Sequence, residues 1–149
     1  MSLLEVNNLT VSFGDNHVVR DVSFVVRPGE LLGIIGESGS GKSLSMLAVM
    51  GLLPDGATVS GSIRFDGKEL LQRSDAKMSK FRGKHIGMVF QDPLASLNPL
   101  MTIGKQVAQP LINHKIASRK AARLRATELC SLVGLPEPQR MVESYPHQL

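Results

Sequence analysis

The chain has 149 residues, of which 42% are hydrophobic and 20% are charged, an ordinary globular composition sufficient for one domain or slightly more. Aromatic residues make up 4% and Trp is absent, which disfavours the stacking platforms of single-strand nucleic-acid-binding proteins. The formal net charge is only +4, the single Cys excludes a disulfide framework, and no stretch approaches the roughly 20 apolar residues that span a bilayer.

Apolar and polar residues alternate in two stretches near the start of the chain. The stretches cover residues 4–13 and 22–26, and the turn-forming segment Gly14-Asp15-Asn16-His17 separates them. Alternation with a period of two is typical of a strand that is buried on one face only. The sequence therefore predicts an antiparallel hairpin in this part of the chain.

A phosphate-binding pattern follows the hairpin. The apolar run Leu31-Leu32-Gly33-Ile34-Ile35 predicts a strand that is buried on both faces. Directly after it, Gly36-Glu37-Ser38-Gly39-Ser40-Gly41-Lys42-Ser43 matches G-x-x-x-x-G-K-S/T, and apolar residues then recur at helical spacing until Pro54. This strand, loop and helix context distinguishes the motif from a chance glycine-rich turn.

Each residue type in this loop suits the binding of a triphosphate. Gly36, Gly39 and Gly41 allow the backbone N–H groups to converge on the phosphates, and the following helix directs its free N–H groups and positive dipole end at them. Lys42 adds a charge that reaches the β- and γ-phosphates, and the Ser43 hydroxyl is suited to bind Mg²⁺. The predicted binding residues are Gly36, Glu37, Ser38, Gly39, Ser40, Gly41, Lys42 and Ser43.

Further strand patterns follow the loop. Residues 60–65 predict a strand that ends in the turn pair Asp66-Gly67, and residues 70–82 are polar with a helical tendency, typical of surface. The segment His85-Ile86-Gly87-Met88-Val89-Phe90 predicts a second buried strand that runs into Gln91.

Helical patterns replace strand patterns after residue 92. One helix is predicted from Ile103 to about His114, interrupted by Pro110, and another over 118–133, with Ser118 as N-cap and an end at Gly134. The apolar stripe expected on the second helix consists of Ala122, Ala126, Leu129 and Val133. We therefore predict a nucleotide-binding core over 1–91 and a helical part over 92–149.

Two further features of the helical part leave alternatives open. Five positive charges lie close together, which suits a solvated helix face or a site for acidic lipid headgroups or nucleic acid; they are Lys115, Arg119, Lys120, Arg123 and Arg125. Cys130 lies in a helical pattern and is expected to be a small buried hydrophobic residue.

The order of these elements resembles the nucleotide-binding domain of ABC transporters. Within that family, the segment Gln91-Asp92-Pro93-Leu94-Ala95-Ser96-Leu97-Asn98-Pro99 resembles the Q-loop of the oligopeptide, dipeptide and nickel importers. Residues 88–90 and the final segment Tyr145-Pro146-His147-Gln148-Leu149 are similar to the same subfamily. The resemblance implies an α/β fold, namely a P-loop NTPase core with an antiparallel β subdomain and the start of the ABC helical subdomain.

The resemblance also implies roles for two residues outside the loop. Gln91 would be the Q-loop glutamine, which joins Ser43 in the Mg²⁺ shell, although a polar residue at a strand end is the alternative. Phe13 matches the A-loop aromatic residue that stacks on adenine, although a Phe at the end of an amphipathic strand is often part of the core. The family more often has Tyr there, so Phe13 keeps the ring but lacks the hydroxyl.

The function that the resemblance implies is that of the ATP-binding component of an importer for peptides or related solutes. Its cofactors would be ATP and Mg²⁺, and its partners would be integral-membrane permease subunits and a second ATP-binding subunit, without nucleic acid. Such a protein is expected to be peripheral, on the cytoplasmic side of the cell (inner) membrane. The solute and the permease stay open.

The sequence departs from the family's pattern at its end. A signature Leu-Ser-Gly-Gly-Gln would begin at Leu149, and no Walker B strand, catalytic glutamate or switch histidine is found by pattern. We therefore expect the N-terminal half of such a subunit, without catalytic residues; the alternative is a truncated, inactive fragment with at most residual nucleotide binding. A small GTPase or kinase is disfavoured because neither Asn-Lys-x-Asp nor Asp-x-x-Gly follows the loop.

Overall fold

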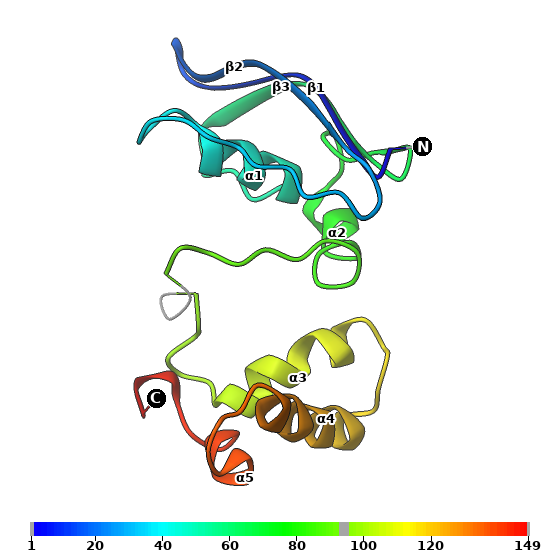
Figure 1. The fold of residues 1–149 in the computed structure, drawn as a ribbon, viewed down its shortest axis with the longest axis vertical. Helices are drawn as coiled ribbons and strands as arrows, with labels where there is room; N and C mark the ends of the chain where they lie inside the picture. Colours follow the sequence, from blue (N-terminus) through cyan, green and yellow to red (C-terminus); the bar gives the residue numbers. More distant parts are fainter. Residues whose placement is uncertain (1, 93–95, 149) are drawn as a thin grey trace. The chain divides into compact units, whose positions relative to one another are not determined.

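The computed structural model describes residues 2–92 and 96–148 and divides into two compact units, Met1–Arg82 and Gly83–Leu149 (Figure 1). The first unit contains a four-stranded antiparallel sheet in the order β2-β1-β3-β4. Its strands are β1 (Leu4–Phe13), β2 (Asn16–Val26), β3 (Ala57–Phe65) and β4 (Lys68–Glu69). The predicted hairpin is confirmed, with a tighter turn than expected because Phe13 already pairs with Asn16.

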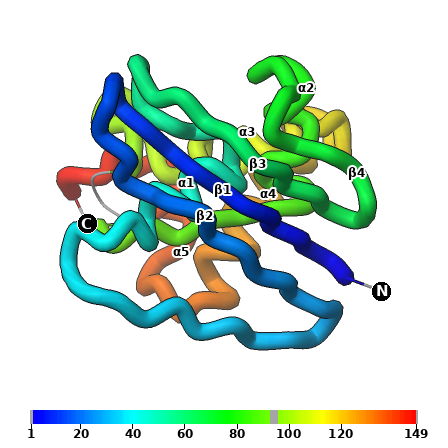
Figure 2. The backbone as a smooth tube through the Cα atoms, turned by 90° about the horizontal axis from the view of Figure 1, so that it is seen from above, coloured from blue at the N-terminus to red at the C-terminus, as the bar shows by residue number. Residues whose placement is uncertain are grey.

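Helix α1 (Lys42–Met50) packs against β1, and both ribbon and tube views place it beside the sheet (Figure 2). The sheet contributes the largest fully buried side chains, namely Val6, Leu9, Val11, Val19 and Ile63. The helix ends where Gly51 takes the left-handed conformation at φ 63°, and its N–H donates to the Ala48 carbonyl oxygen at 3.0 Å. The apolar run beyond Met50 is therefore not helical, because the left-handed cap ends the helix.

The predicted buried strand over 31–35 is wrong. These residues form no strand, and the side chains at the two ends of the run are almost fully exposed, Leu31 at 97% and Ile35 at 98%. A strand exists only where its N–H and C=O groups pair with a neighbouring strand. Within the described part of the first unit, no strand pairs with this run. Its apolar side chains are therefore suited to burial in a sheet but are exposed here.

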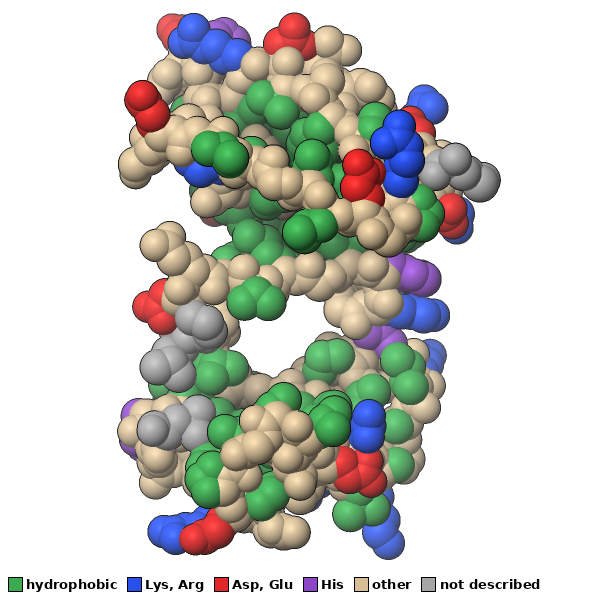
Figure 3. Space-filling view, viewed as in Figure 1, with side chains coloured by type: hydrophobic (Ala, Val, Ile, Leu, Met, Phe, Trp, Pro, Cys, Tyr) green, Lys and Arg blue, Asp and Glu red, His purple; other side chains and the backbone are tan. Residues whose placement is uncertain are grey.

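The second predicted buried strand, over 85–90, is also wrong. Within this segment only Ile86 forms an isolated bridge, and residues 87–90 have no regular structure. Val89 is 87% exposed. The physical reason is the same, since no strand among the described residues pairs with this segment. The space-filling view accordingly shows hydrophobic side chains at the surface of both units (Figure 3).

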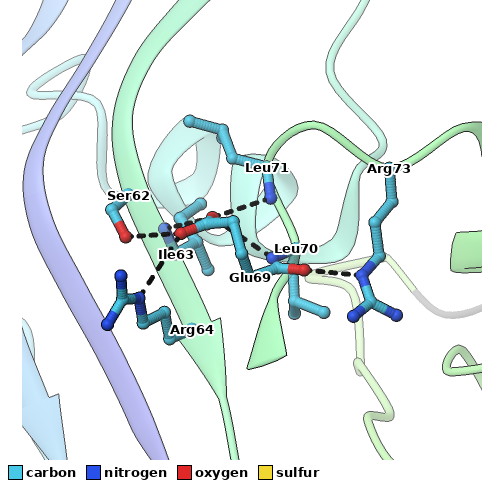
Figure 4. A network of polar contacts seen from close by, with 7 residues as sticks. All are labelled: Ser62, Ile63, Arg64, Glu69, Leu70, Leu71 and Arg73. Atoms are coloured by element: carbon cyan, nitrogen blue, oxygen red, sulfur yellow. Dashed lines mark hydrogen bonds and ion pairs between the residues drawn. The ribbon is translucent and has the colours of Figure 1, made fainter. Parts of the chain in front are cut away.

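Segment 70–82 is more buried than its polarity predicts. It contains the short helix α2 (Asp75–Met78), and both Leu70 and Met78 are 3% exposed. The Glu69 carboxylate organises the start of this segment by accepting from the Ser62 hydroxyl at 2.6 Å and from the N–H groups of Ile63, Leu70 and Leu71 at 3.0–3.2 Å (Figure 4). Burial raises the pKa of Glu69, but these hydrogen bonds outweigh it and lower the pKa below the ordinary value.

The second unit is helical. It contains α3 (Ile103–Asn113), α4 (Arg119–Leu132), α5 (Pro138–Met141) and the 3₁₀ turn η1 (Pro146–Gln148). The predicted N-cap is confirmed, because the Ser118 hydroxyl accepts from the N–H of Ala121 at 3.3 Å. Pro110 was predicted to interrupt α3, but the helix continues through this residue. The ring removes one N–H, but the Pro110 carbonyl still accepts from the N–H of His114 at 3.0 Å, so the helix continues.

Small side chains line the contact between α3 and α4. Ala108 on α3 and Ala122 and Ala126 on α4 are fully buried in one cluster, and Cys130 is buried as expected. Val133 was predicted to share this stripe but is 72% exposed, because it caps α4 rather than continuing it. In the part of the chain that the structure describes, no helix combines the length and hydropathy that crossing a bilayer requires.

Candidate nucleotide-binding site

The phosphate-binding pattern forms an exposed loop that leads into α1. Gly39 and Gly41 have φ values of 79° and 87°, in the left-handed region that residues with a Cβ atom rarely occupy. Gly36 is close to the other side of the loop, since a Cβ atom added there would lie 2.7 Å from the Ser40 hydroxyl oxygen. The loop therefore needs glycine at 39 and 41 for its conformation, whereas a side chain at Gly36 would have to displace the Ser40 hydroxyl.

Gly41 also packs against the hairpin. Val11 pairs with Val19 whereas the next residue, Ser12, pairs with His17, so β2 carries one extra residue, Val18, in a β-bulge. A Cβ atom on Gly41 would lie 2.8 Å from a methyl carbon of Val19 and 3.0 Å from the Val18 carbonyl oxygen. The bulge thus supports the point where the loop becomes α1.

Lys42 lies across the loop. Its ammonium group donates to the carbonyl oxygens of Gly36 and Glu37, each at 2.6 Å, and to the Ser40 hydroxyl at 3.3 Å. The loop residues that precede the lysine therefore curl around its charge. This arrangement places a cation where phosphate oxygens would compete with the loop's own oxygens for it.

The first turn of α1 is suited to an anion. It contains no acidic residue, and no side chain caps its N–H groups. The Ser45 hydroxyl is occupied, since it donates to the Gly41 carbonyl oxygen at 2.9 Å. The Ser43 side chain, in contrast, is exposed and forms no hydrogen bond with the described residues. The free N–H groups and the helix dipole attract phosphate, and an unoccupied hydroxyl oxygen beside them fits the oxygen ligands that Mg²⁺ prefers.

Phe13 belongs to the same unit as the loop. It ends β1 and is half-buried, paired with Asn16 on one side and Ala57 on the other. Phe13 and Val11 are two residues apart on β1, so they share a sheet face. Val11 pairs with Val19, the residue that Gly41 contacts, and Phe13 therefore lies on the face against which the loop packs.

Gln91 belongs to the other unit. It is exposed, and it precedes residues 93–95, which lie outside the described residues, as does Leu149 of the expected signature motif. The structure thus contains Phe13 and the loop in one unit, whereas Gln91 belongs to the other. Among residues 2–92 and 96–148, no group of three or more His, Cys, Asp or Glu side chains is arranged to hold a metal ion.

Two structural features gave no sequence signal. One is the Val18 bulge, and the other is Gln106 on α3. The Gln106 side chain accepts from the N–H of Asn98 at 2.8 Å and donates to the Asn98 and Met101 carbonyl oxygens at 2.9 Å. It therefore holds the segment between residue 96 and α3. Both features depend on partners that only the fold brings close.

Comparison with known proteins agrees with the motif. A family model described as "ABC transporter" matches residues 19–149. "Oligopeptide transport ATP-binding protein OppD" of Mycobacterium tuberculosis is 51% identical over 99% of this chain and 25% of its own length. OppD of Bacillus subtilis is 47% identical over 98% of this chain and 42% of its own length. "Dipeptide transport ATP-binding protein DppD" of B. subtilis is 45% identical over 98% of this chain and 45% of its own length.

The fold is shared with a solved ABC cassette. The dimeric "ATP-binding cassette MJ0796 bound to ADP and Pi" superposes with a TM-score of 0.80 at 30% identity, over 98% of this chain and 62% of that chain. The expected α/β fold of a P-loop NTPase with an antiparallel β subdomain is thereby confirmed. The chain spans between a quarter and about half of the length of the curated relatives described above. Because the family model covers most of its residues, the protein belongs to the ABC transporter family.

Proposed function

We propose that this chain binds ATP with Mg²⁺ and forms part of the ATP-binding component of a transporter that imports peptides or related solutes. The observation that carries the proposal is the position of Lys42, whose ammonium group is surrounded by three oxygens of the loop Gly36–Ser43 at the start of α1. A triphosphate is the ligand that this combination of cation, glycine loop and helix N-terminus suits best.

Binding would proceed by exchange of partners at Lys42. Phosphate oxygens replace the carbonyl oxygens of Gly36 and Glu37 around the ammonium group, and a charged acceptor makes the stronger hydrogen bond. The free N–H groups of the first turn of α1 hold the same phosphates. The Phe13 ring stacks on the adenine, since it lies on the sheet face against which the loop packs.

Ser43 and Gln91 would hold Mg²⁺ together with phosphate oxygens. When bound, the ion neutralises the charge of the β- and γ-phosphates. Ser43 is supported as a ligand by its exposed hydroxyl at the start of α1, beside the proposed phosphates. Gln91 is proposed from its match to the Q-loop.

The cellular role follows from the names of the relatives, which are oligopeptide and dipeptide transport ATP-binding proteins. We propose that residues 1–91 are the nucleotide-binding core and that 92–149 begin the helical subdomain. The partners would be integral-membrane permease subunits and a second ATP-binding subunit. The protein would then lie at the cytoplasmic face of the membrane without spanning it.

A second candidate is a nucleotide-binding chain without turnover. It is supported by the sequence, in which no Walker B strand with an adjacent glutamate to orient water is found by pattern. The test is phosphate release by the purified 149-residue chain with Mg²⁺. Release no greater than that of a Lys42→Ala variant supports this candidate, whereas turnover that Lys42→Ala abolishes favours an active ATPase.

The test of the main proposal is calorimetric titration of the chain with ATP, with and without Mg²⁺. Binding of ATP that Mg²⁺ strengthens is the expected result, because both the ion and Lys42 neutralise phosphate charge. No binding of ATP with Mg²⁺, by a chain whose circular dichroism shows it folded, would contradict the proposal.

A further inference from the structure

One long segment of the second unit carries positive charge without any negative charge. Between Asp92 and Glu128 the sequence contains no Asp or Glu, but it contains six basic residues, namely Lys105, Lys115, Arg119, Lys120, Arg123 and Arg125. This segment therefore has more positive charge than the formal net charge of +4 of the whole chain. Such a local excess favours contact with an anionic partner.

Helices α3 and α4 bring four of these cations together. The side chains of Lys105 on α3 and of Arg119, Lys120 and Arg123 on α4 border one pocket between the two helices, and we call these four residues the basic patch. All four are exposed, and none forms an ion pair with the described residues. The same border contains one carboxylate, Glu143.

Arginines outside the basic patch have acidic partners within the second unit. Arg125 pairs with Glu128 at 2.8 Å, and Arg140 pairs with Glu137 at 3.5 Å. The charge of these arginines is therefore compensated within the unit, whereas the charge of the basic patch faces solvent.

Aliphatic side chains stand beside these cations. Leu124 borders the same pocket, lies one helical turn from Lys120 and is 61% exposed. Ile116 is 60% exposed in the turn that leads from α3 to α4, next to the exposed Lys115. Exposed aliphatic groups among Lys and Arg suit the interface of a bilayer, where cations contact headgroup phosphates and aliphatic groups reach the start of the acyl chains.

We propose that the basic patch, together with Leu124 and Ile116, binds the surface of an anionic lipid bilayer. The inference goes beyond the proposed function, in which permease subunits bring the chain to the membrane, because here the chain itself contacts lipid. A nucleic acid would use the cations but would leave Leu124 in water. It would also lack stacking partners, since no aromatic residue occurs between Phe90 and Tyr145.

The experiment is sedimentation of the full chain with lipid vesicles. One set contains phosphatidylcholine with phosphatidylglycerol, and the other contains phosphatidylcholine alone. We expect binding to the anionic vesicles that weakens as salt is added, and at least about tenfold weaker binding to the neutral vesicles. Equal binding to both sets would overturn the proposal, because exposed apolar residues anywhere in the chain would then explain it. No binding to either set would overturn it as well.

Charge variants locate the binding. Arg119→Gln with Arg123→Gln should weaken binding to anionic vesicles about tenfold or more, since each basic side chain near the surface contributes about fivefold. The matched control is Arg125→Gln with Arg140→Gln, which removes the same charge outside the basic patch and should change binding by less than about threefold. Equal losses in the two double variants would overturn the proposal. Thermal unfolding of each variant checks that the helices are intact.

A neutral substitution tests the aliphatic contact. Leu124→Gln should weaken binding to anionic vesicles about threefold to fivefold, because the burial of a largely exposed leucine is lost. Leu132→Gln is the control, since Leu132 is 78% exposed on the same helix but does not border the pocket, and it should bind like the wild type. Equal binding by Leu124→Gln and the wild type would overturn the proposal, since charge alone would then suffice.

A duplex DNA arm tests the other polyanion. DNA binding that needs Arg119 and Arg123, without vesicle binding, would overturn the proposal in favour of a nucleic-acid site. The proposed function fails separately, because a chain that does not bind ATP but binds anionic vesicles through the basic patch leaves this inference intact.

Discussion

The Gly41 backbone lies directly against Val19, so close that a single added methyl group would come within 2.8 Å of the valine side chain. This contact joins the hairpin to the phosphate loop, because the β2 bulge that includes Val18 presents both a carbonyl oxygen and a methyl group to the glycine. The conformation of the loop therefore depends on the hairpin as well as on its own glycines.

Gly41→Ala should destabilise the first unit and weaken ATP binding. The residue has a φ of 87°, where an L side chain costs about 1–2 kcal/mol, and the clash with Val18 and Val19 adds about 1–2 kcal/mol. Urea unfolding followed by circular dichroism measures the loss in the free energy of unfolding.

The matched control for that variant is Gly39→Ala. Gly39 has a similar φ of 79°, but no atom lies within 4 Å of the position where a Cβ would be added. Only the cost of the left-handed conformation, about 1–2 kcal/mol, should appear. If both alanine variants lose the same stability, the contact with β2 does not support the loop.

Phe13→Ala should weaken ATP more than it weakens inorganic triphosphate. Stacking on adenine contributes only to the ligand that has a base, and the loss is expected to be about fivefold to tenfold for ATP. Calorimetry with both ligands measures the difference. A Phe13 that serves the core alone would weaken both ligands equally through lost stability, and Phe13→Tyr should have almost no effect under our proposal.

Glu69→Gln should destabilise the first unit at neutral pH and much less in acid. The hydrogen bonds from Ser62 and three backbone N–H groups lower the pKa of Glu69 below its ordinary value of 4.5 although burial raises it. The ionised carboxylate therefore contributes stability that is fully present above the unfolded pKa and is lost as the pH falls through the folded pKa. Urea unfolding of both proteins at neutral pH and in steps below 4.5 measures this loss.

Asp55→Asn is the control variant for Glu69→Gln. Asp55 is exposed and has no hydrogen bond or ion pair with the described residues, so its variant should unfold at the same urea concentration as the wild type at neutral pH. A Glu69→Gln effect that stays constant from neutral pH to strong acid would contradict a role for the ionised carboxylate.

Local patterns predicted the parts of the fold that depend on nearby residues. The hairpin, the helix after the loop and the Ser118 cap are confirmed because alternation, glycine turns and capping act within a few residues. The apolar runs 31–35 and 85–90 were predicted as strands and are not, since pairing needs a second segment that composition does not reveal. Apolar composition therefore predicts that a segment is suited to a sheet, not that a sheet forms.

The candidate site was likewise predictable only in part. The residues of the phosphate loop follow from a local motif, and the oxygens that surround the Lys42 ammonium group come from the loop itself. The support from Val18 and Val19 was not predictable, because a bulge depends on the register between two strands. The same holds for the pocket between α3 and α4, which depends on how two helices pack.

The central claim, that the loop around Lys42 binds the phosphates of ATP, is tested most directly by calorimetric titration of Lys42→Ala with ATP and Mg²⁺. Lys80→Ala serves as the control, since it removes the same charge from an exposed residue outside the loop. We predict that Lys42→Ala weakens ATP by about tenfold or more, as expected for a charge-assisted contact of about 1.5–3 kcal/mol, and that Lys80→Ala binds like the wild type. Equal ATP affinity for Lys42→Ala and the wild type would contradict the account.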